Sequence, residues 1–179
     1  MYVYAKRNIA GREEAHELLA RAGREAWGLS PLPEMVREGR GKPRFSAYPG
    51  YQFNLSHSGE FALCALDDAP VGADIQVVRR DLRERLPKRV CSPEELDWLR
   101  RQEDQWMAFA QLWSLKEARV KFTGEGLGAM LSGIAVPLPE RGKSLYLLDG
   151  LWFRLYDIPG CACAVCGQNP PPEEILWLS

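Results

Sequence analysis

The last part of the chain carries one long helix candidate followed by several short strand candidates. Apolar residues at helical spacing predict the helix over 105–122. Four strands are expected after it, near 132–138, 144–148, 151–158 and 161–166. Asp149-Gly150 stands between two of these strands and is typical of a hairpin turn, which makes that pair antiparallel. A helix followed by hairpin-linked strands indicates an α+β fold.

The first half of the chain has the same mixture of elements. Residues 12–27 carry alanine and leucine at helical spacing, which predicts an amphipathic helix. Alternating or continuous apolar residues predict three strands, over 51–55, 61–66 and 71–78, with a turn at 57–60. Ser92-Pro93-Glu94-Glu95 has the capping residues that open a further helix. The whole chain is therefore predicted to be α+β.

Composition excludes several classes of protein. The 179 residues, 46% of them apolar and 26% charged, suffice for one domain or for two fused halves with a substantial core. A formal net charge of -1 gives no general attraction to nucleic acid or to acidic membranes. The N-terminus becomes charged too early for a secretory signal, and no apolar run could span a bilayer. We expect a cytoplasmic protein.

Five cysteines occur, at positions 64, 91, 161, 163 and 166. An odd number without a secretory signal indicates reduced thiols. Cys161, Cys163 and Cys166 invite a zinc interpretation, but on a strand Cys166 faces away from the other two. Three cysteines that cannot converge, with no histidine nearby, favour small buried hydrophobic residues instead.

Asp74 interrupts the apolar strand predicted over 71–78. A carboxylate in a buried strand is costly unless a cation or hydrogen-bond donors compensate it. Two interpretations stay open from this residue alone: a metal ligand, or a structural acid that caps a turn or pairs with an arginine.

Trp113, Glu117 and Lys121 are spaced four residues apart, so they share one face of the predicted helix. A glutamate and a lysine in this arrangement often form only a solvated ion pair. Here, however, the face leads directly into Gly124-Glu-Gly126-Leu-Gly128, a segment whose backbone can approach a ligand closely.

Further phosphate-binding candidates lie nearer the N-terminus. Lys42, held next to Pro43, offers a point charge, while Ser56 and His57 offer a hydroxyl and an imidazole. Although a lone histidine is usually structural, one in a polar turn is equally suited to donate to a ligand. Together with Asp74, Glu117 and Lys121, these groups are equipped to handle a diphosphate through Mg²⁺.

Four motifs in register give the chain a specific resemblance. Gly41-Lys42-Pro43, Asn54-Leu-Ser-His-Ser58, Val71-Gly-Ala-Asp-Ile75 and Trp113-Ser-Leu-Lys-Glu-Ala-Arg-Val-Lys121 follow one another in this order. Their order and intervals resemble those of the surfactin-synthetase-type phosphopantetheinyl transferases. The resemblance covers about residues 40–179.

The resemblance implies a fold and a ligand. The fold would consist of two similar α+β halves related by a pseudo-twofold axis, which we divide into residues 1–86 and 87–179. Two halves in one chain would make a monomer sufficient. Coenzyme A would bind between them, with Lys42 and Pro43 at the adenosine end and with Ser56 and His57 at the phosphates. Asp74 and Glu117 would bind Mg²⁺, and Lys121 would bind the diphosphate.

The resemblance also implies a reaction. A serine of an apo carrier protein would attack the pantetheine-side phosphorus of coenzyme A, and 3′,5′-ADP would leave. Glu117 is the candidate to accept the serine proton, directly or through water, and its roles as base and as metal ligand cannot be separated by sequence. Catalysis would thus depend on Glu117, Lys121 and Asp74.

Two features depart from the family pattern. Gln76 stands two residues after Asp74, where an acid is usual, so the expected metal set of Asp74, Glu117 and Gln76 has one negative charge fewer. The N-terminal segment is also shorter than is usual in the family, and Glu17 occupies a position where an arginine is common. The candidates to replace that arginine at the 3′-phosphate are Arg7, Arg12, Arg21 and Arg24.

A basic segment follows the strand of Asp74. Residues 79–89 contain six lysines and arginines against two acids: Arg79, Arg80, Arg83, Arg85, Lys88 and Arg89 against Asp81 and Glu84. This segment is either a solvated face or a dock for an acidic carrier-protein helix. Two other functions compete with transfer: Mg²⁺-dependent phosphate-ester hydrolysis, and non-catalytic binding of coenzyme A or a carrier by a degenerate relative.

Overall fold

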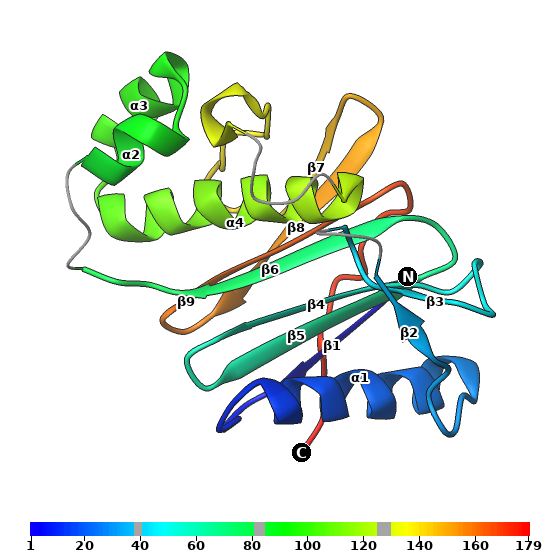
Figure 1. Cartoon of the computed structure of the whole chain (residues 1–179). Coiled ribbons are helices and arrows are strands. Elements are labelled where there is room, and N and C mark those ends of the chain that lie inside the picture. The colour runs from blue at the N-terminus through cyan, green and yellow to red at the C-terminus, as the bar shows by residue number, and fades with distance from the viewer. Residues whose placement is uncertain (38–40, 81–84, 125–129) are drawn as a thin grey trace.

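The computed structural model describes residues 1–37, 41–80, 85–124 and 130–179. A four-stranded sheet in the order β10-β1-β5-β4 lies in the lower half of Figure 1. Its strands are β1 (Tyr2–Lys6), β4 (Gln52–Ser58), β5 (Phe61–Asp67) and β10 (Leu176–Trp177). Helix α1 (Arg12–Trp27) covers one face of this sheet, so the first half forms a helix-on-sheet layer pair.

A second four-stranded sheet has the order β6-β9-β8-β7 and lies above the first in Figure 1. Its strands are β6 (Val71–Val77), β7 (Leu145–Leu148), β8 (Leu151–Ile158) and β9 (Cys161–Gly167). All its neighbouring strands pair antiparallel, with Asp149-Gly150 joining β7 to β8 as predicted. Helix α4 (Gln105–Thr123) covers this sheet, and the observed mixture confirms the α+β class.

The remaining elements are short. Strands β2 (Met35–Val36) and β3 (Arg44–Phe45) form a small hairpin. Helices α2 (Arg85–Val90) and α3 (Pro93–Arg100) precede α4, and α3 begins with the predicted capping box at Ser92 and Glu95. No helix in the described ranges is long and apolar enough to cross a membrane.

The strand expected over 132–138 is wrong. A 3₁₀ helix, η1 (Leu131–Gly133), stands at its beginning, and the rest is irregular. Two physical reasons favour this outcome. Pro137 and Pro139 have no backbone N–H to donate to a sheet, and the Lys116 ammonium takes the carbonyls of Leu131 and Ile134 as acceptors.

Strand β4 is longer than predicted. It runs through His57 and Ser58, which the sequence analysis placed in a turn, and the turn itself consists of Gly59 and Glu60. The strand is also buried on both faces at Phe53, Asn54 and Ser56, because it is packed against β6.

Cys161, Cys163 and Cys166 lie on β9 as the strand pattern predicts. Cys161 and Cys163 pack into one hydrophobic cluster with β1, β5 and β6, whereas Cys166 packs into another, beneath α4. All five cysteines of the chain are buried free thiols. The three cysteines of β9 are therefore small hydrophobic core side chains, packed on the two faces of the strand.

The division between residues 86 and 87 stays a prediction. The two sheets do not follow it, because β6 pairs with β9 in the second sheet and β10 pairs with β1 in the first. Each half of the chain therefore contributes a strand to the other half's sheet.

Candidate functional site

The two sheets meet where β4 lies beside β6. Three side chains of β4 accept hydrogen bonds from backbone N–H groups of β6: Asn54 from Ala73 at 2.9 Å, Ser56 from Ile75 at 3.3 Å, and Ser58 from Val77 at 3.1 Å. We call this set of three bonds the seam. Because β6 is the edge strand of its sheet, the seam satisfies N–H groups that would otherwise be unpaired.

Helix α4 approaches β6 closely at Gly72. A Cβ atom added there would lie 1.9 Å from the carbonyl oxygen of Ala118 and 2.6 Å from the amide nitrogen of Phe122. Only glycine permits this contact. Since side chains alternate along a strand, Asp74 and Gln76 lie on the same side of β6 as Gly72 and face α4.

Asp74 is joined to α4 and to β4 through one carboxylate oxygen. Its Oδ1 lies 2.6 Å from Lys121 Nζ and 3.0 Å from the Ser56 hydroxyl, which donates to it. Lys121 Nζ also donates to Ser56 Oγ at 3.0 Å. The three side chains form a closed triangle, and its Ser56 corner is only 7% exposed.

Two buried oxygens near this triangle have no hydrogen-bond partner among the described residues: Asp74 Oδ2 and Glu117 Oε1. Burial raises the pKa of the Glu117 carboxyl, the negative charge of Asp74 raises it further, and Lys121 opposes both effects. Unpaired carboxylate oxygens are costly when buried. A hard divalent cation bound by both oxygens would compensate this charge, so the pair fits Mg²⁺.

A cavity of about 600 Å³ opens beside the carboxylates. Five of the predicted site residues line it: Lys42, Pro43, His57, Glu117 and Lys121. Gly124, which ends α4 with a positive φ of 77°, lines it as well, whereas Gly126 and Gly128 lie outside the described residues. These residues come from three segments distant in sequence and converge on one cavity.

Lys42 connects the loop of this cavity to β6. Its ammonium donates to the carbonyl of Val71, the first residue of β6. Burial lowers the Lys42 pKa to about 8. The Lys42 ammonium therefore loses its proton more readily than an ordinary lysine does. A phosphate bound beside it would stabilise the charged form.

Three predicted residues, Asp74, Ser56 and Gln76, are not among the described lining residues of the cavity, although Asp74 is paired with Lys121 at its wall. Ser56 is turned toward Asp74, and its hydroxyl donates to that carboxylate. It is not among the described lining residues of the cavity. Gln76 borders a separate cavity of about 110 Å³ with Phe109, Ala110 and Trp113, and its amide donates to Val77 O at 3.2 Å. The metal role of Gln76 stays a prediction.

Three basic residues of the cavity lining belong to none of the four motifs. Arg12 and His16 of α1 line the cavity, as does Arg37 after β2. The spacing of four between Arg12 and His16 could have indicated a shared helix face. Nothing local distinguished Arg37, because its position depends on the β2–β3 hairpin.

Lys116, also without a predicted role, is fully buried. Its ammonium lies 2.8 Å from Glu95 Oε1 and donates to two carbonyls, of Leu131 and Ile134. These contacts tie α3 and η1 to α4 directly beside Glu117. Lys116 therefore helps to fix the position of the α4 segment that carries Glu117.

Fold and site together define a class of protein. An α+β chain presents buried carboxylates, cationic side chains and a cavity, and this set is suited to a phosphorylated ligand and a divalent cation.

Comparison with known proteins narrows this class. The sequence model of the 4′-phosphopantetheinyl transferase superfamily matches residues 70–162. A 4′-phosphopantetheinyl transferase of Bacillus subtilis is 35% identical over 179 residues, covering 92% of this chain and 79% of the relative. The psf-1 transferase of Bacillus pumilus is 37% identical over 154 residues, covering 80% of this chain. The AcpT transferase of Salmonella typhimurium is 47% identical over 120 residues, covering 65% of this chain and 57% of the relative.

The chain belongs to the 4′-phosphopantetheinyl transferase superfamily. It spans 65% of the length of the Bacillus pumilus relative, so the relatives have additional residues with no counterpart in the match.

Proposed function

We propose that this chain transfers the 4′-phosphopantetheine group of coenzyme A to a serine of an apo carrier protein and releases 3′,5′-ADP. The observation that carries the proposal is the cluster of Asp74, Glu117 and Lys121 at the edge of a cationic cavity. The names of the relatives, which are 4′-phosphopantetheinyl transferases, support the same reaction.

The proposed step exchanges one P–O bond for another. The serine Oγ forms a bond to the pantetheine-side phosphorus, the bridging P–O bond of the diphosphate breaks, and the bridging oxygen leaves on 3′,5′-ADP. Glu117 accepts the serine proton, directly or through water, and its raised pKa makes it a stronger base than an ordinary glutamate.

Asp74 and Glu117 are the proposed ligands of Mg²⁺, with Gln76 as a third candidate. Bound there, the ion would supply positive charge against the diphosphate oxygens. Lys121 has the same electrostatic task from the protein side, since its ammonium lies at the cavity wall and next to Asp74. Lys42, Pro43 and His57 orient the nucleotide end of coenzyme A along the cavity.

The order of the strands supports a pseudo-twofold relation between two halves. The first half runs β1-α1-β4-β5 along the chain, and its sheet has the order β1-β5-β4. The second sheet and its helix follow the chain order β6-α4-β8-β9 when the shorter elements are left aside, and that sheet has the order β6-β9-β8, although β6 precedes the division at residue 86. On this proposal β4 and β6 meet near the junction of the halves, and one chain suffices as a monomer.

The carrier partner is proposed to dock beside α2 and α3. Arg79, Arg80, Lys88 and Arg89 are exposed there, while Arg83 lies outside the described residues. A cavity of about 660 Å³ next to them combines basic side chains with the apolar Leu96, Trp106 and Phe109. An apolar floor with a basic rim suits an acidic amphipathic helix.

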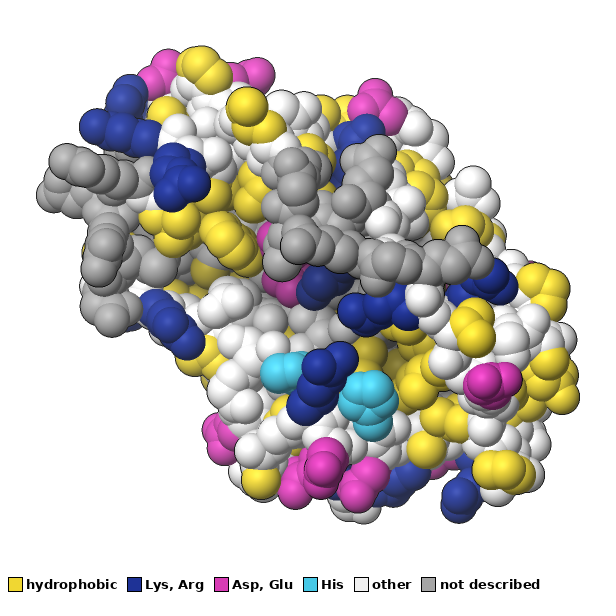
Figure 2. Space-filling view, in the orientation of Figure 1, with side chains coloured by type: hydrophobic (Ala, Val, Ile, Leu, Met, Phe, Trp, Pro, Cys, Tyr) yellow, Lys and Arg dark blue, Asp and Glu magenta, His cyan; other side chains and the backbone are white. Residues whose placement is uncertain are grey.

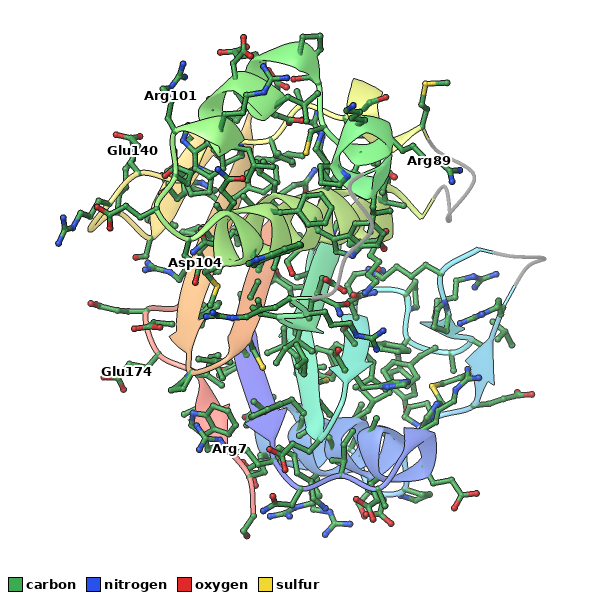
Figure 3. All side chains as sticks on the ribbon, turned by 90° about the vertical axis from the view of Figure 1, so that its left-hand side faces the viewer. Arg7, Arg89, Arg101, Asp104, Glu140 and Glu174 are labelled. Carbon is green, nitrogen blue, oxygen red and sulfur yellow. The ribbon has the colours of Figure 1, made fainter. Side chains whose placement is uncertain are left out.

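Docking predicts a defined effect of charge reversal. The double substitution Arg79→Glu with Lys88→Glu should raise the KM for the carrier and leave the KM for coenzyme A unchanged. Arg101→Glu with Arg141→Glu is the matched control, because it changes the net charge equally around a different cavity. Figure 3 shows Arg89 and Arg101 on opposite sides of the helical layer in that view. Equal effects of both pairs on the carrier would contradict docking.

One experiment separates transfer from the two competing functions. The protein is incubated with coenzyme A, Mg²⁺ and an apo carrier protein, and the carrier is weighed by mass spectrometry. A mass gain equal to phosphopantetheine supports transfer. Free 3′,5′-ADP with an unmodified carrier indicates hydrolysis, and the absence of both products indicates a binding protein.

A further inference from the structure

We propose that Glu95 and Lys116 are positioning residues for the proposed reaction. Their buried ion pair fixes the turn of α4 that carries Glu117, and so sets kcat and the affinity for Mg²⁺ without contact with coenzyme A. The inference rests on the proposed function, because Glu117 has its role there. Neither Glu95 nor Lys116 is among the described residues that line the cavity of that site.

The Lys116 ammonium is fully engaged in the interior of the protein. Its side chain is 0% exposed, and Nζ lies 2.8 Å from Glu95 Oε1. Nζ also donates to the carbonyl oxygens of Leu131 at 2.9 Å and of Ile134 at 2.8 Å. An ammonium has three N–H donors, so each of them has one acceptor. Three acceptors from two other segments lock the end of this long side chain, and with it the α4 backbone at residue 116.

The Glu95 carboxylate is fixed through both of its oxygens. While Oε1 faces Lys116, Oε2 accepts a hydrogen bond from the Ser92 backbone N–H at 2.6 Å. The Ser92 hydroxyl accepts in turn from the Glu95 N–H at 3.2 Å. These two bonds are the capping box that begins α3. The ion pair therefore joins the first turn of α3 to the middle of α4.

Stability alone does not explain a charged pair at this place. The surrounding core is apolar and includes Leu99, Leu112 and Leu115. Desolvation of two buried charges offsets their attraction, and apolar residues of similar volume often stabilise a core as well or better. The pair adds direction instead, because hydrogen bonds hold atoms within a narrower range of distances and angles than apolar contacts do.

Helix α4 is held from two opposite sides at this turn. On the sheet side, Gly72 of β6 approaches the backbone of Ala118 closely. Figure 1 shows α3 on the other side of α4, away from β6 and β9, and Lys116 makes the contact there. Glu117 lies between these two contact points, so together they restrain both the rotation and the translation of the helix where its carboxylate leaves the backbone.

Glu117 depends on this restraint more than Lys121 does. The Lys121 ammonium is bound directly to Asp74 and Ser56. By contrast, Glu117 is only 5% exposed, and its Oε1 has no hydrogen-bond partner among the described residues. Figure 2 shows acidic side chains set back near the middle of the face on which the two histidines lie, and both histidines line the cavity. A displaced α4 turn should therefore move Glu117 while Lys121 stays tied to Asp74.

Lys116→Met tests the inference, because it removes the charge and keeps an unbranched apolar side chain. We expect kcat for carrier modification to fall by about ten- to a hundredfold. The affinity for Mg²⁺, titrated calorimetrically into the protein with coenzyme A bound, should fall by about tenfold. The affinity for coenzyme A, measured without Mg²⁺, should change by less than about twofold, since the groups that bind it are held independently.

The double variant Glu95→Gln with Lys116→Met separates positioning from stability. It removes the uncompensated buried carboxylate that Lys116→Met leaves behind, and glutamine also serves in a capping box. The double variant should therefore regain most of the urea midpoint that Lys116→Met loses, while its kcat and Mg²⁺ affinity stay low. Phe153→Leu is the control, because Phe153 is fully buried in the same hydrophobic cluster. It should lower the urea midpoint and leave kcat and both affinities unchanged.

Three results would each overturn the inference: recovery of kcat together with the urea midpoint in the double variant, an equal fall of kcat in Phe153→Leu, or unchanged kcat and Mg²⁺ affinity in Lys116→Met. If the unmodified protein modified no carrier, the proposed function would fail, and the Mg²⁺ affinities would still decide whether the pair positions Glu117. Absence of Mg²⁺ binding by the unmodified protein would overturn the inference as well.

Discussion

Lys121 Nζ lies 2.6 Å from Asp74 Oδ1, so an ion pair joins helix α4 to strand β6 at the edge of the cavity. The pair uses one oxygen of the aspartate and leaves the other without a partner among the described residues. Because Ser56 donates to the same Oδ1, strand β4 is connected to the pair as well. The relative positions of α4, β4 and β6 therefore determine where the free Oδ2 of Asp74 lies.

Gly72→Ala should destabilise the protein strongly. The new methyl group would overlap the backbone of Ala118 and Phe122, which cannot move without displacing α4. We expect a loss of about 3 kcal/mol or more in the free energy of unfolding, measured by urea denaturation. Gly133→Ala is the control: nothing lies within 4 Å of its added methyl group, so a change within about 0.5 kcal/mol is expected. Equal losses in both variants would contradict the close packing.

Ser56→Ala and Ser58→Ala separate the seam from the site. Each substitution leaves one N–H group of β6 without its acceptor and should cost about 1–3 kcal/mol of stability. Ser56 alone contacts Asp74 and Lys121, so only Ser56→Ala should raise the Mg²⁺ concentration for half-maximal activity, by about tenfold. A higher KM for coenzyme A with an unchanged Mg²⁺ midpoint would instead support a phosphate-binding role for Ser56.

The sequence predicted the parts of the site that depend on local geometry. The spacing of four placed Glu117 and Lys121 on one helix face, and both line the cavity. The apolar run with an embedded acid indicated that Asp74 is buried and compensated, and it is, by Lys121 and Ser56. Helix 12–27 and strand 151–158 have the predicted bounds, because caps and turn residues mark their ends.

The remaining features depend on contacts between distant residues. The direction of the Ser56 hydroxyl follows from the seam, which joins residues 19 positions apart, and no local pattern encodes it. The failed strand at 132–138 involves Lys116, which takes two carbonyls from that segment. Strand β10 has two residues and exists through its pairing with β1 at the other end of the chain. The residue roles themselves stay predictions.

Lys42 should make coenzyme A binding sensitive to alkaline pH. Its pKa is lowered to about 8 by burial, so the ammonium is charged below pH 8 and loses its charge as the pH rises through 8. We expect kcat/KM for coenzyme A, which reports the free enzyme, to fall above about pH 8. Lys42→Arg should remove this fall, because a guanidinium stays protonated throughout that range. An identical fall in Lys42→Arg would assign the titration to another group.

Gln76→Glu should strengthen metal binding if position 76 reaches the ion. Gln76 lies on the same side of β6 as Asp74, about 7 Å further along the strand, and a carboxylate there would add negative charge near Asp74 and Glu117. We expect the Mg²⁺ concentration for half-maximal activity to fall severalfold, because the added negative charge attracts the cation more strongly. Calorimetric titration with Mg²⁺ alone provides an independent measurement.

Gln111→Glu is the control for this substitution, because it makes the same change on α4 at a different cavity. It should leave the Mg²⁺ midpoint unchanged, since its charge is separated from Asp74 and Glu117 and is screened by solvent. A midpoint that does not move in Gln76→Glu would mean that position 76 does not contact the ion. Asp74 and Glu117 would then be the only proposed ligands left, and Gln76 would only border the small cavity that it shares with Phe109 and Trp113.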